Sequence, residues 1–116
     1  MKKENHLLKT NDFAKVYEKR HKIQSSCMSV YYSKNELGYL RVGLSVSKKV
    51  GKAHTRVRIR RLIRALMDKY NSYSGSYDVI IVARVGFEKH KFLELYEELR
   101  TILNRFLKEN LDEKKN

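Results

Sequence analysis

Residues 45–70 constrain the fold most strongly, because they place an apolar stripe and a cluster of arginines on one predicted helix. The stripe consists of Ile59, Ile63, Leu66 and Tyr70. A helix turns by about 100° per residue, so these four side chains fall within an arc of about 60°. An apolar stripe of this kind must be buried against other elements. The helix is therefore predicted to cover a core with its stripe and to turn its basic side outward.

The basic side of this helix has no acidic neighbour to neutralise it. Arg56, Arg60 and Arg64 follow one another at intervals of four residues, and Arg58 and Arg61 lie beside them. Like charges at this spacing repel, at a cost of about 0.2–0.5 kcal/mol per pair. No Asp or Glu occurs between positions 45 and 67. Guanidinium groups bind phosphate oxygens in bidentate fashion, so the pattern favours a polyphosphate partner outside the chain.

The overall charge points to the same class of partner. The chain has 116 residues and a net charge of +13, which attracts nucleic acid or an anionic membrane surface. Residues 1–70 contain 18 basic and 5 acidic residues, whereas residues 71–116 contain 8 of each. The binding surface is therefore expected in the first 70 residues.

The remaining periodicity predicts an α+β fold made of a single domain that spans residues 1–116. The predicted elements follow the order αββαβα: a helix over 12–20, strands over 23–33 and 40–47, the arginine helix, a strand over 78–84 and a helix over 88–108. A turn over 34–38 predicts a hairpin between the first two strands. The continuous apolar run at 78–84 is typical of a central strand. Residues 1–9 and 109–116 are expected to be flexible.

Two predicted faces could bind an extended strand of nucleic acid. The helix over 12–20 places Phe13, Val16 and Tyr17 on one side, and these side chains either pack on the core or offer rings for base stacking. The outer side of the strand over 40–47 carries only Arg41, Gly43, Ser45 and Ser47. This polar face fits a binding floor and an ordinary solvated sheet equally well.

No pattern for self-sufficient catalysis is present. His6, His21, His54 and His90 are scattered, and Val46 occupies the position where a phosphate-binding P-loop requires glycine. The single cysteine, Cys27, excludes an internal disulfide and is expected to be buried. No window is apolar enough for a membrane span or a signal peptide. We therefore expect a soluble cytoplasmic binding module without an organic cofactor.

Four segments together resemble the protein subunit of bacterial ribonuclease P. The segment RVGLSVSKKVGKA at 41–53 precedes a helix that follows the pattern R-N-x-x-K-R-x-I-R at 56–64, and DVIIVAR follows at 78–84. The pattern DFxxVY occurs at 12–17. Two positions depart from the family: Val57 replaces the signature asparagine, and Arg60 replaces lysine with the same charge. Helix geometry puts Val57 on the basic side, away from the apolar stripe.

The resemblance implies a sandwich like that of a ribosomal-protein domain, with an unusual left-handed βαβ crossover. It implies that an RNA subunit carries the active site and binds most of the Mg²⁺, and that the partners are this RNA and precursor tRNA, with no membrane and no obligate protein partner. The implied RNA-subunit contacts are Lys48, Lys49, Lys52, Arg56, Arg58, Arg60, Arg61 and Arg64. The implied contacts to the 5′ leader of the precursor are Phe13, Tyr17, Tyr31, Arg41, Ser45 and Ser47.

Two other readings explain part of the pattern. A structural RNA-binding protein of the ribosomal type would account for the charge and the fold, but it would make the polar sheet face ordinary surface. A membrane-surface protein would use the basic helix to bind lipid. Against this reading, the apolar side chains of that helix are needed to cover the sheet and form the core. The ribosomal-type reading predicts that the chain does not change cleavage of precursor tRNA at low Mg²⁺. The membrane reading predicts binding to anionic liposomes that RNA does not compete away.

Overall fold

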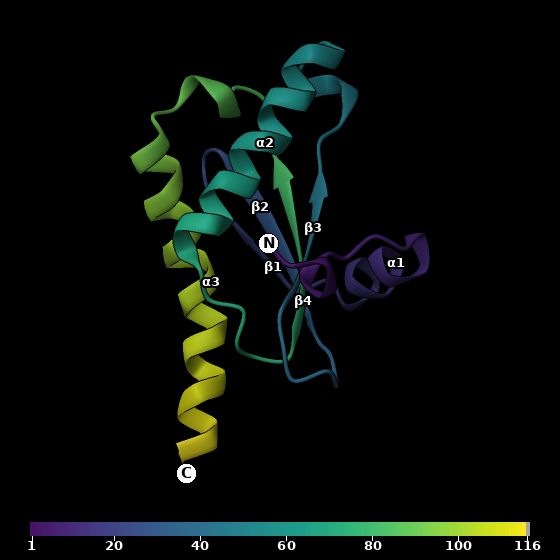
Figure 1. Ribbon diagram of the computed structural model, residues 1–116, viewed down its shortest axis with the longest axis vertical. Coiled ribbons are helices and arrows are strands. Elements are labelled where there is room, and N and C mark those ends of the chain that lie inside the picture. Colours follow the sequence, from purple (N-terminus) through teal and green to yellow (C-terminus); the bar gives the residue numbers. More distant parts are fainter. Residues whose placement is uncertain (116) are drawn as a thin grey trace.

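A four-stranded mixed sheet separates one helix from two others in the computed structural model, which describes residues 1–115 and the side chains of residues 1–107 (Figure 1). The helices are α1 (Thr10–Lys19), α2 (Ala53–Tyr70) and α3 (Phe92–Lys115). The strands are β1 (Lys22–Gln24), β2 (Met28–Lys34), β3 (Arg41–Ser45) and β4 (Tyr77–Ala83). Three short 3-10 helices are η1 (Lys3–Asn5), η2 (Lys48–Val50) and η3 (Phe87–Lys89). The predicted α+β sandwich is confirmed.

The strand order across the sheet is β1-β2-β4-β3. The apolar run at 78–84 forms β4, and its prediction as a central strand is confirmed. It pairs antiparallel with β2 and parallel with β3. The strand predicted over 23–33 is instead two strands, because Ser25 turns the chain: its backbone N–H donates to the Met28 carbonyl over 2.8 Å. β1 and β2 pair antiparallel across this turn.

The predicted hairpin over 34–38 is wrong, because β4 lies between β2 and β3. A strand that is apolar on both faces is buried best in the middle of a sheet, and this preference overrides pairing between neighbours in sequence. The turn residues instead shape a wider connection. The Leu37 N–H donates to Asn35 Oδ1 over 3.0 Å, and the Asn35 N–H donates to the Ser76 carbonyl over 2.9 Å.

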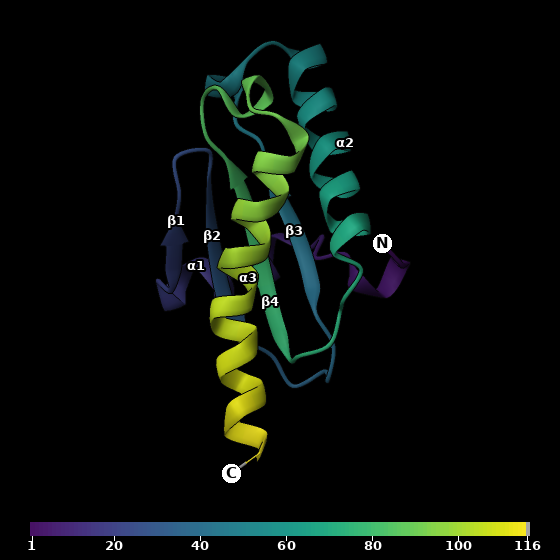
Figure 2. The same cartoon turned by 90° about the vertical axis from the view of Figure 1, so that its left-hand side faces the viewer.

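The connection from β3 through α2 to β4 has the left-handed sense that the family resemblance implied. In Figure 2 both strands run upward and α2 lies in front of the sheet, while the chain moves from β3 on the right to β4 on the left. A right-handed crossover would move the other way. Because the right-handed sense is the default for βαβ units, periodicity alone could not have predicted this feature.

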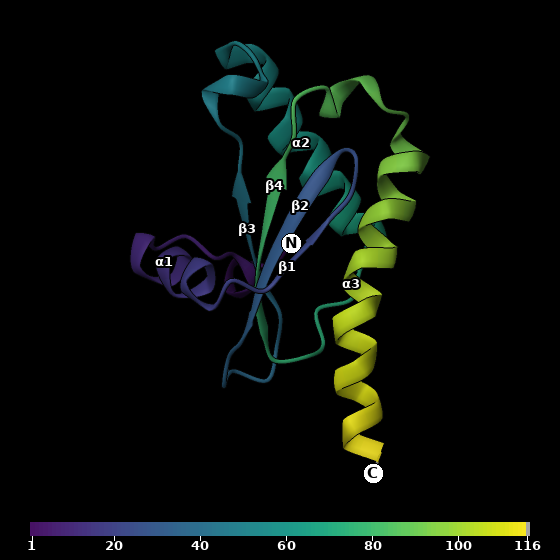
Figure 3. The same ribbon diagram turned by 180° about the vertical axis from the view of Figure 1, so that it is seen from behind.

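The main core lies between the sheet and the pair α2 and α3. Ile59, Ile63 and Leu66 have no exposed surface, so the predicted stripe is confirmed. Tyr70 is half-buried, and its hydroxyl donates to Asn104 Oδ1 of α3 over 2.9 Å. α1 covers the opposite face of the sheet (Figure 3). A smaller buried cluster consists of Leu7, Val16 of α1 and Ile80 of β4.

The two ends of the chain were predicted to be flexible. Residues 1–9 are not a free tail: Asn5 Nδ2 donates to the Leu40 carbonyl over 2.8 Å, and the Leu7 N–H donates to the Val42 carbonyl over 3.0 Å. The reason is that β3 is an edge strand, and this segment satisfies part of its unpaired edge. At the other end, α3 extends to Lys115 rather than 108. The predicted flexibility of residues 109–116 stays a prediction.

Candidate nucleic-acid interface

The start of α2 and the turn before it present a basic surface, which we call the arginine surface. Its members are Lys48, Lys49, Lys52, Arg56, Arg58, Arg60, Arg61 and Arg64. Six of them are exposed, and Arg56 and Arg60 are half-buried. Among residues with described side chains, none of the eight forms an ion pair with a carboxylate. The first turn of α2 contains no acidic residue and has no side-chain cap. The surface therefore combines uncompensated cations with free backbone N–H groups, both of which favour phosphate.

Two details of this surface bear on the binding of an anion. Arg56 Nε is buried without a hydrogen-bond partner in the described structure. A buried donor that lacks a partner is costly, so a phosphate oxygen within its reach would be stabilising. Val57 is 43% exposed on the basic side of the helix, in agreement with the predicted geometry. Nothing in the structure explains an apolar residue at this position.

Aromatic side chains from α1 and β2 meet on the other face of the sheet. The rings of Tyr17 and Tyr31 lie edge to face, with their centroids 4.8 Å apart. Tyr17 is 36% exposed and Tyr31 is half-buried, so both rings have surface available to a ligand. Ser45 is half-buried at the end of β3, and Ser47 is exposed beyond it. We call this surface, which includes Phe13, Tyr17, Tyr31, Ser45 and Ser47, the open side of α1. It offers the edges of aromatic rings beside small polar side chains of the sheet.

Phe13 reaches the sheet because Gly43 leaves room for its ring. A Cβ atom built on Gly43 would lie 2.5 Å from Phe13 Cζ, closer than carbon atoms can approach. Any larger residue at position 43 would displace the ring. Gly43 was predicted only as part of the polar face of the strand over 40–47. A glycine within an alternating strand is the available signal, because it often marks the close approach of another group.

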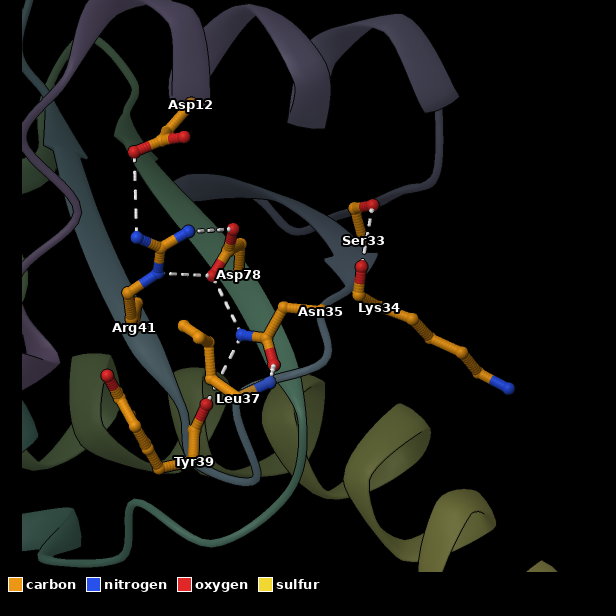
Figure 4. A network of polar contacts seen from close by, with 8 residues as sticks. All are labelled: Asp12, Ser33, Lys34, Asn35, Leu37, Tyr39, Arg41 and Asp78. Atoms are coloured by element: carbon orange, nitrogen blue, oxygen red, sulfur yellow. Dashed lines mark hydrogen bonds and ion pairs between the residues drawn. The ribbon is translucent and has the colours of Figure 1, made fainter.

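Arg41 lies in an internal network, which Figure 4 shows. Its Nε and Nη2 atoms donate to the two carboxylate oxygens of Asp78 over 2.8 and 2.7 Å. Asp12 of α1 lies 3.5 Å from Nη1. The hydrogen bond with Asp78 raises the pKa of Arg41. This arginine therefore joins β3, β4 and α1, and its charge is compensated within the chain.

Asn35 extends the network to the connection after β2. Its Nδ2 atom donates to Asp78 Oδ1 over 2.8 Å and to the Tyr39 carbonyl over 3.2 Å. Sequence reasoning missed both Asn35 and Asp78. The usable signal was a single carboxylate at the start of an otherwise apolar strand, because a buried charge needs a partner.

The described residues contain no group of three His, Cys, Asp or Glu side chains that could hold a metal ion. Cys27 is fully buried, as predicted, and its thiol donates to the Glu98 carboxylate. The pKa of Cys27 is raised to about 12, mainly by burial and secondly by this hydrogen bond. The thiol is therefore a poor nucleophile near neutral pH. No helix in the described part of the chain is both long enough and apolar enough to cross a membrane.

Comparisons with known proteins agree on one family. The family model described as Ribonuclease P matches residues 1–107. The chain is 36% identical to the ribonuclease P protein component of Mesoplasma florum over 110 residues, covering 93% of this chain and 100% of the relative. It is 41% identical to that of Legionella pneumophila strain Corby, covering 84% and 85%. The solved structure of the Staphylococcus aureus RNase P protein is similar with a TM-score of 0.76 and 32% identity, covering 86% of this chain and 93% of that one.

Proposed function

The chain belongs to the ribonuclease P protein family, and from this membership we propose that it binds the RNA subunit of that endoribonuclease and assists removal of the 5′ leader from precursor tRNA. Family membership makes the chain a protein component of ribonuclease P, with a role in the maturation of tRNA 5′ ends. It also disfavours the alternative of a structural protein of the ribosomal type. The roles of individual surfaces are the subject of the proposal.

The arginine surface is proposed to bind the RNA subunit. The observation that supports this most is the absence of carboxylate partners, in the described part of the chain, for eight neighbouring cations. Elsewhere the chain does pair its arginines: Arg100 Nη2 lies 2.7 Å from Glu97 Oε2 on α3. Uncompensated guanidinium groups on one helix match a phosphate backbone, which supplies most of the salt-dependent affinity of such complexes.

The open side of α1 is proposed to hold the 5′ leader as an extended single strand. Phe13, Tyr17 and Tyr31 provide ring surface for bases, and stacking of this kind contributes about 1–3 kcal/mol per base. Ser45 and Ser47 offer hydroxyl groups at the end of the floor. Arg41 has a different part in this proposal, because its guanidinium is already bound by Asp78. It holds α1 in place and leaves the leader phosphates to other groups.

The chemistry of phosphodiester cleavage is proposed to belong to the RNA subunit. The Mg²⁺ ions that the family implies are assigned in this proposal to the RNA, where they would activate water and stabilise charge at the cleaved phosphate. The protein contributes binding and orientation. The cytoplasm, where tRNA precursors are made, is the proposed compartment.

A reconstituted cleavage assay tests the proposal. Purified protein is added to ribonuclease P RNA and precursor tRNA at low Mg²⁺, and cleavage at the 5′ end of the mature sequence is followed with and without a leader of several nucleotides. We expect the protein to accelerate cleavage and to increase affinity more for the leader-bearing precursor. Unchanged cleavage on addition of protein would contradict the assignment to ribonuclease P.

A further inference from the structure

The open side of α1 has no free cation of its own. None of the residues that define it is charged, and Arg41, the arginine predicted for it, is already bound by Asp78 (Figure 4). An RNA strand carries a negative charge at every phosphate, so a surface that binds only the bases leaves those charges without partners. Cations that bind the phosphates are therefore expected where this surface ends.

The pairing register carries the floor of this surface across the whole sheet. Residues that lie opposite one another on neighbouring strands point to the same face. One such row crosses the four strands in the order Gly43, Ile80, Tyr31 and Lys22. The adjoining row on the same face runs Ser45, Val82, Ser29 and Gln24. The floor that begins at Ser45 on β3 therefore ends at Lys22 and Gln24 on β1, about 14 Å away across three strand spacings.

α1 follows the first of these rows. Its Phe13 ring lies against Gly43 of β3, and its Tyr17 ring meets Tyr31 of β2 with the centroids 4.8 Å apart. Arg20 caps the helix, and its backbone N–H donates to the Tyr17 carbonyl over 3.1 Å. The last turn of α1 therefore places Arg20 near the β1 end of the floor.

Arg20 has a backbone conformation that arginine rarely adopts. Its φ of 58° and ψ of 19° lie in the left-handed region, where a Cβ atom is strained and glycine is usual. Its side chain forms no hydrogen bond or ion pair with any residue whose side chain is described. An arginine at a strained position without a partner in the fold indicates that its guanidinium serves binding.

Lys22 lies beside the aromatic pair. Its Nζ atom is 5.7 Å from the centroid of the Tyr31 ring, within the range of a cation–π contact. Lys22 and Arg20 are both exposed, and neither forms an ion pair in the part of the chain with described side chains. Glu18, the carboxylate closest to them in sequence, pairs with neither. Two uncompensated cations thus lie where the ring surface ends.

We propose that Arg20, Lys22 and Gln24 form a distal end of the leader-binding surface, where the two cations bind phosphates of the 5′ leader that lie beyond Tyr31. The inference rests on the proposed function, because it extends the surface assigned there to the leader. The leader crosses the sheet from β3 to β1, with bases on the rings of α1 and β2 and distal phosphates on the β1 end. Leader length therefore determines how much of the protein is contacted.

A series of leader lengths tests the proposal in the assembled enzyme. Precursors whose leaders grow one nucleotide at a time are titrated with enzyme that contains the wild-type protein or the double variant Arg20→Gln, Lys22→Gln. Affinity should stop rising at a shorter leader in the variant, and the longest leaders should bind about tenfold more weakly, because phosphate contacts are lost. The shortest leaders should bind both enzymes equally. Equal affinity for the longest leaders would overturn the proposal.

The charge-matched control is Lys91→Gln, Arg105→Gln. It removes two exposed cations, one just before α3 and one on that helix, which covers the other face of the sheet. Its leader-length profile should match that of the wild type. An equal loss in the control would mean that net charge alone attracts the leader, contrary to the proposal. Weaker binding of the free RNA subunit by Arg20→Gln, Lys22→Gln would also contradict it, because the site would then serve the RNA subunit.

Arg20→Gly separates leader binding from stability. Glycine relieves the left-handed strain, so the midpoint of urea denaturation should rise, while affinity for the longest leaders should fall about threefold. Asn71→Gly is the matched control, because it changes the other non-glycine residue with positive φ in the described chain and removes no charge. This control should leave leader affinity unchanged. A lower urea midpoint for Arg20→Gly would show that the arginine serves the fold and would refute its assigned role.

The same assays distinguish failure of this inference from failure of the proposed function. If the wild-type protein accelerates cleavage and favours leader-bearing precursor, but the variants at positions 20 and 22 leave the leader-length profile unchanged, the distal end is wrong and the proposed function is retained. If the wild-type protein does not change cleavage, the proposed function itself is wrong.

Discussion

Arginine occurs in two contrasting settings in this molecule. On α2, Arg58, Arg61 and Arg64 are exposed and lack carboxylate partners in the described structure. On β3, the Arg41 side chain is 23% exposed and is bound by both oxygens of Asp78. The same type of side chain is therefore open to a partner in one place and joins structural elements in the other. The difference teaches that the carboxylates around an arginine, rather than the arginine itself, decide which role it has.

The largest expected effect follows removal of two α2 cations. The double variant Arg60→Ala, Arg64→Ala should weaken binding to ribonuclease P RNA by about 2 kcal/mol or more, roughly 30-fold, because two charged contacts to phosphate are lost. The slope of log K against log salt should fall by about 0.7–0.9 for each lost contact. Filter binding or fluorescence titration over a range of salt concentrations measures both quantities. The control is Arg100→Ala, which removes an arginine that Glu97 already compensates. A slope like that of the wild type would place these side chains away from the RNA backbone.

Arg41→Ala should lower the stability of the fold and leave RNA binding unchanged. The variant leaves Asp78, which is 8% exposed, without its charged partner, and should lower the free energy of unfolding by about 2 kcal/mol. The salt dependence of RNA-subunit binding should stay unchanged, because this guanidinium is bound within the chain. Urea denaturation and the same binding titrations measure the two effects. A stable variant with a reduced salt slope would show that Arg41 contacts RNA. Arg41 and the arginines of α2 would then have the same role.

Gly43→Ala tests the open side of α1 at a single contact. The added methyl group should displace the Phe13 ring and weaken binding of leader-bearing precursor about tenfold, with little change for leaderless tRNA. Affinities of the assembled enzyme for the two substrates provide the comparison. In a Phe13→Ala background the same substitution should have almost no further effect, because the clash is gone. An equal loss for both substrates would indicate general damage to the fold.

Val57→Asn should have the smallest effect. Position 57 is exposed, so the fold should be unchanged, and restoring the signature amide of the family should strengthen RNA-subunit binding by at most about 1 kcal/mol, or fivefold. Titration of the RNA subunit with both proteins measures the difference. Weaker binding by the asparagine form would mean that valine makes an apolar contact at this interface.

The sequence predicts those features that follow from local periodicity. The stripe of Ile59, Ile63 and Leu66 and the outward side of Val57 follow from spacing along a helix. The central position of β4 follows from its continuous apolar run. The pairing of β4 between β2 and β3 does not, because strand order is set by which arrangement buries the most apolar surface. Turn residues at 34–38 indicate a turn but cannot say which strands lie on either side of it.

The candidate site also has some features that the sequence predicts and others that depend on the tertiary fold. The arginine surface could be predicted because its members lie on one helix and in the turn just before it, and no acidic residue intervenes in the sequence. The partners of Arg41 could not, since Asp12 and Asp78 are distant in sequence and are brought together only by the sheet and α1. The docking of residues 1–9 also depends on a tertiary feature, the exposed edge of β3. Leu7 and Leu8, two apolar residues within a basic tail, were the available hint.

Covalent footprinting tests most directly whether the two regions bind separate RNAs. Lysines are acylated and tyrosines oxidised in the free protein, in its complex with ribonuclease P RNA, and after addition of leader-bearing precursor tRNA. We predict that the RNA subunit alone protects Lys48, Lys49 and Lys52, whereas Tyr17 and Tyr31 become protected only when the leader is present. Protection of both tyrosines by the RNA subunit alone, or lysines that stay reactive in its complex, would contradict the account.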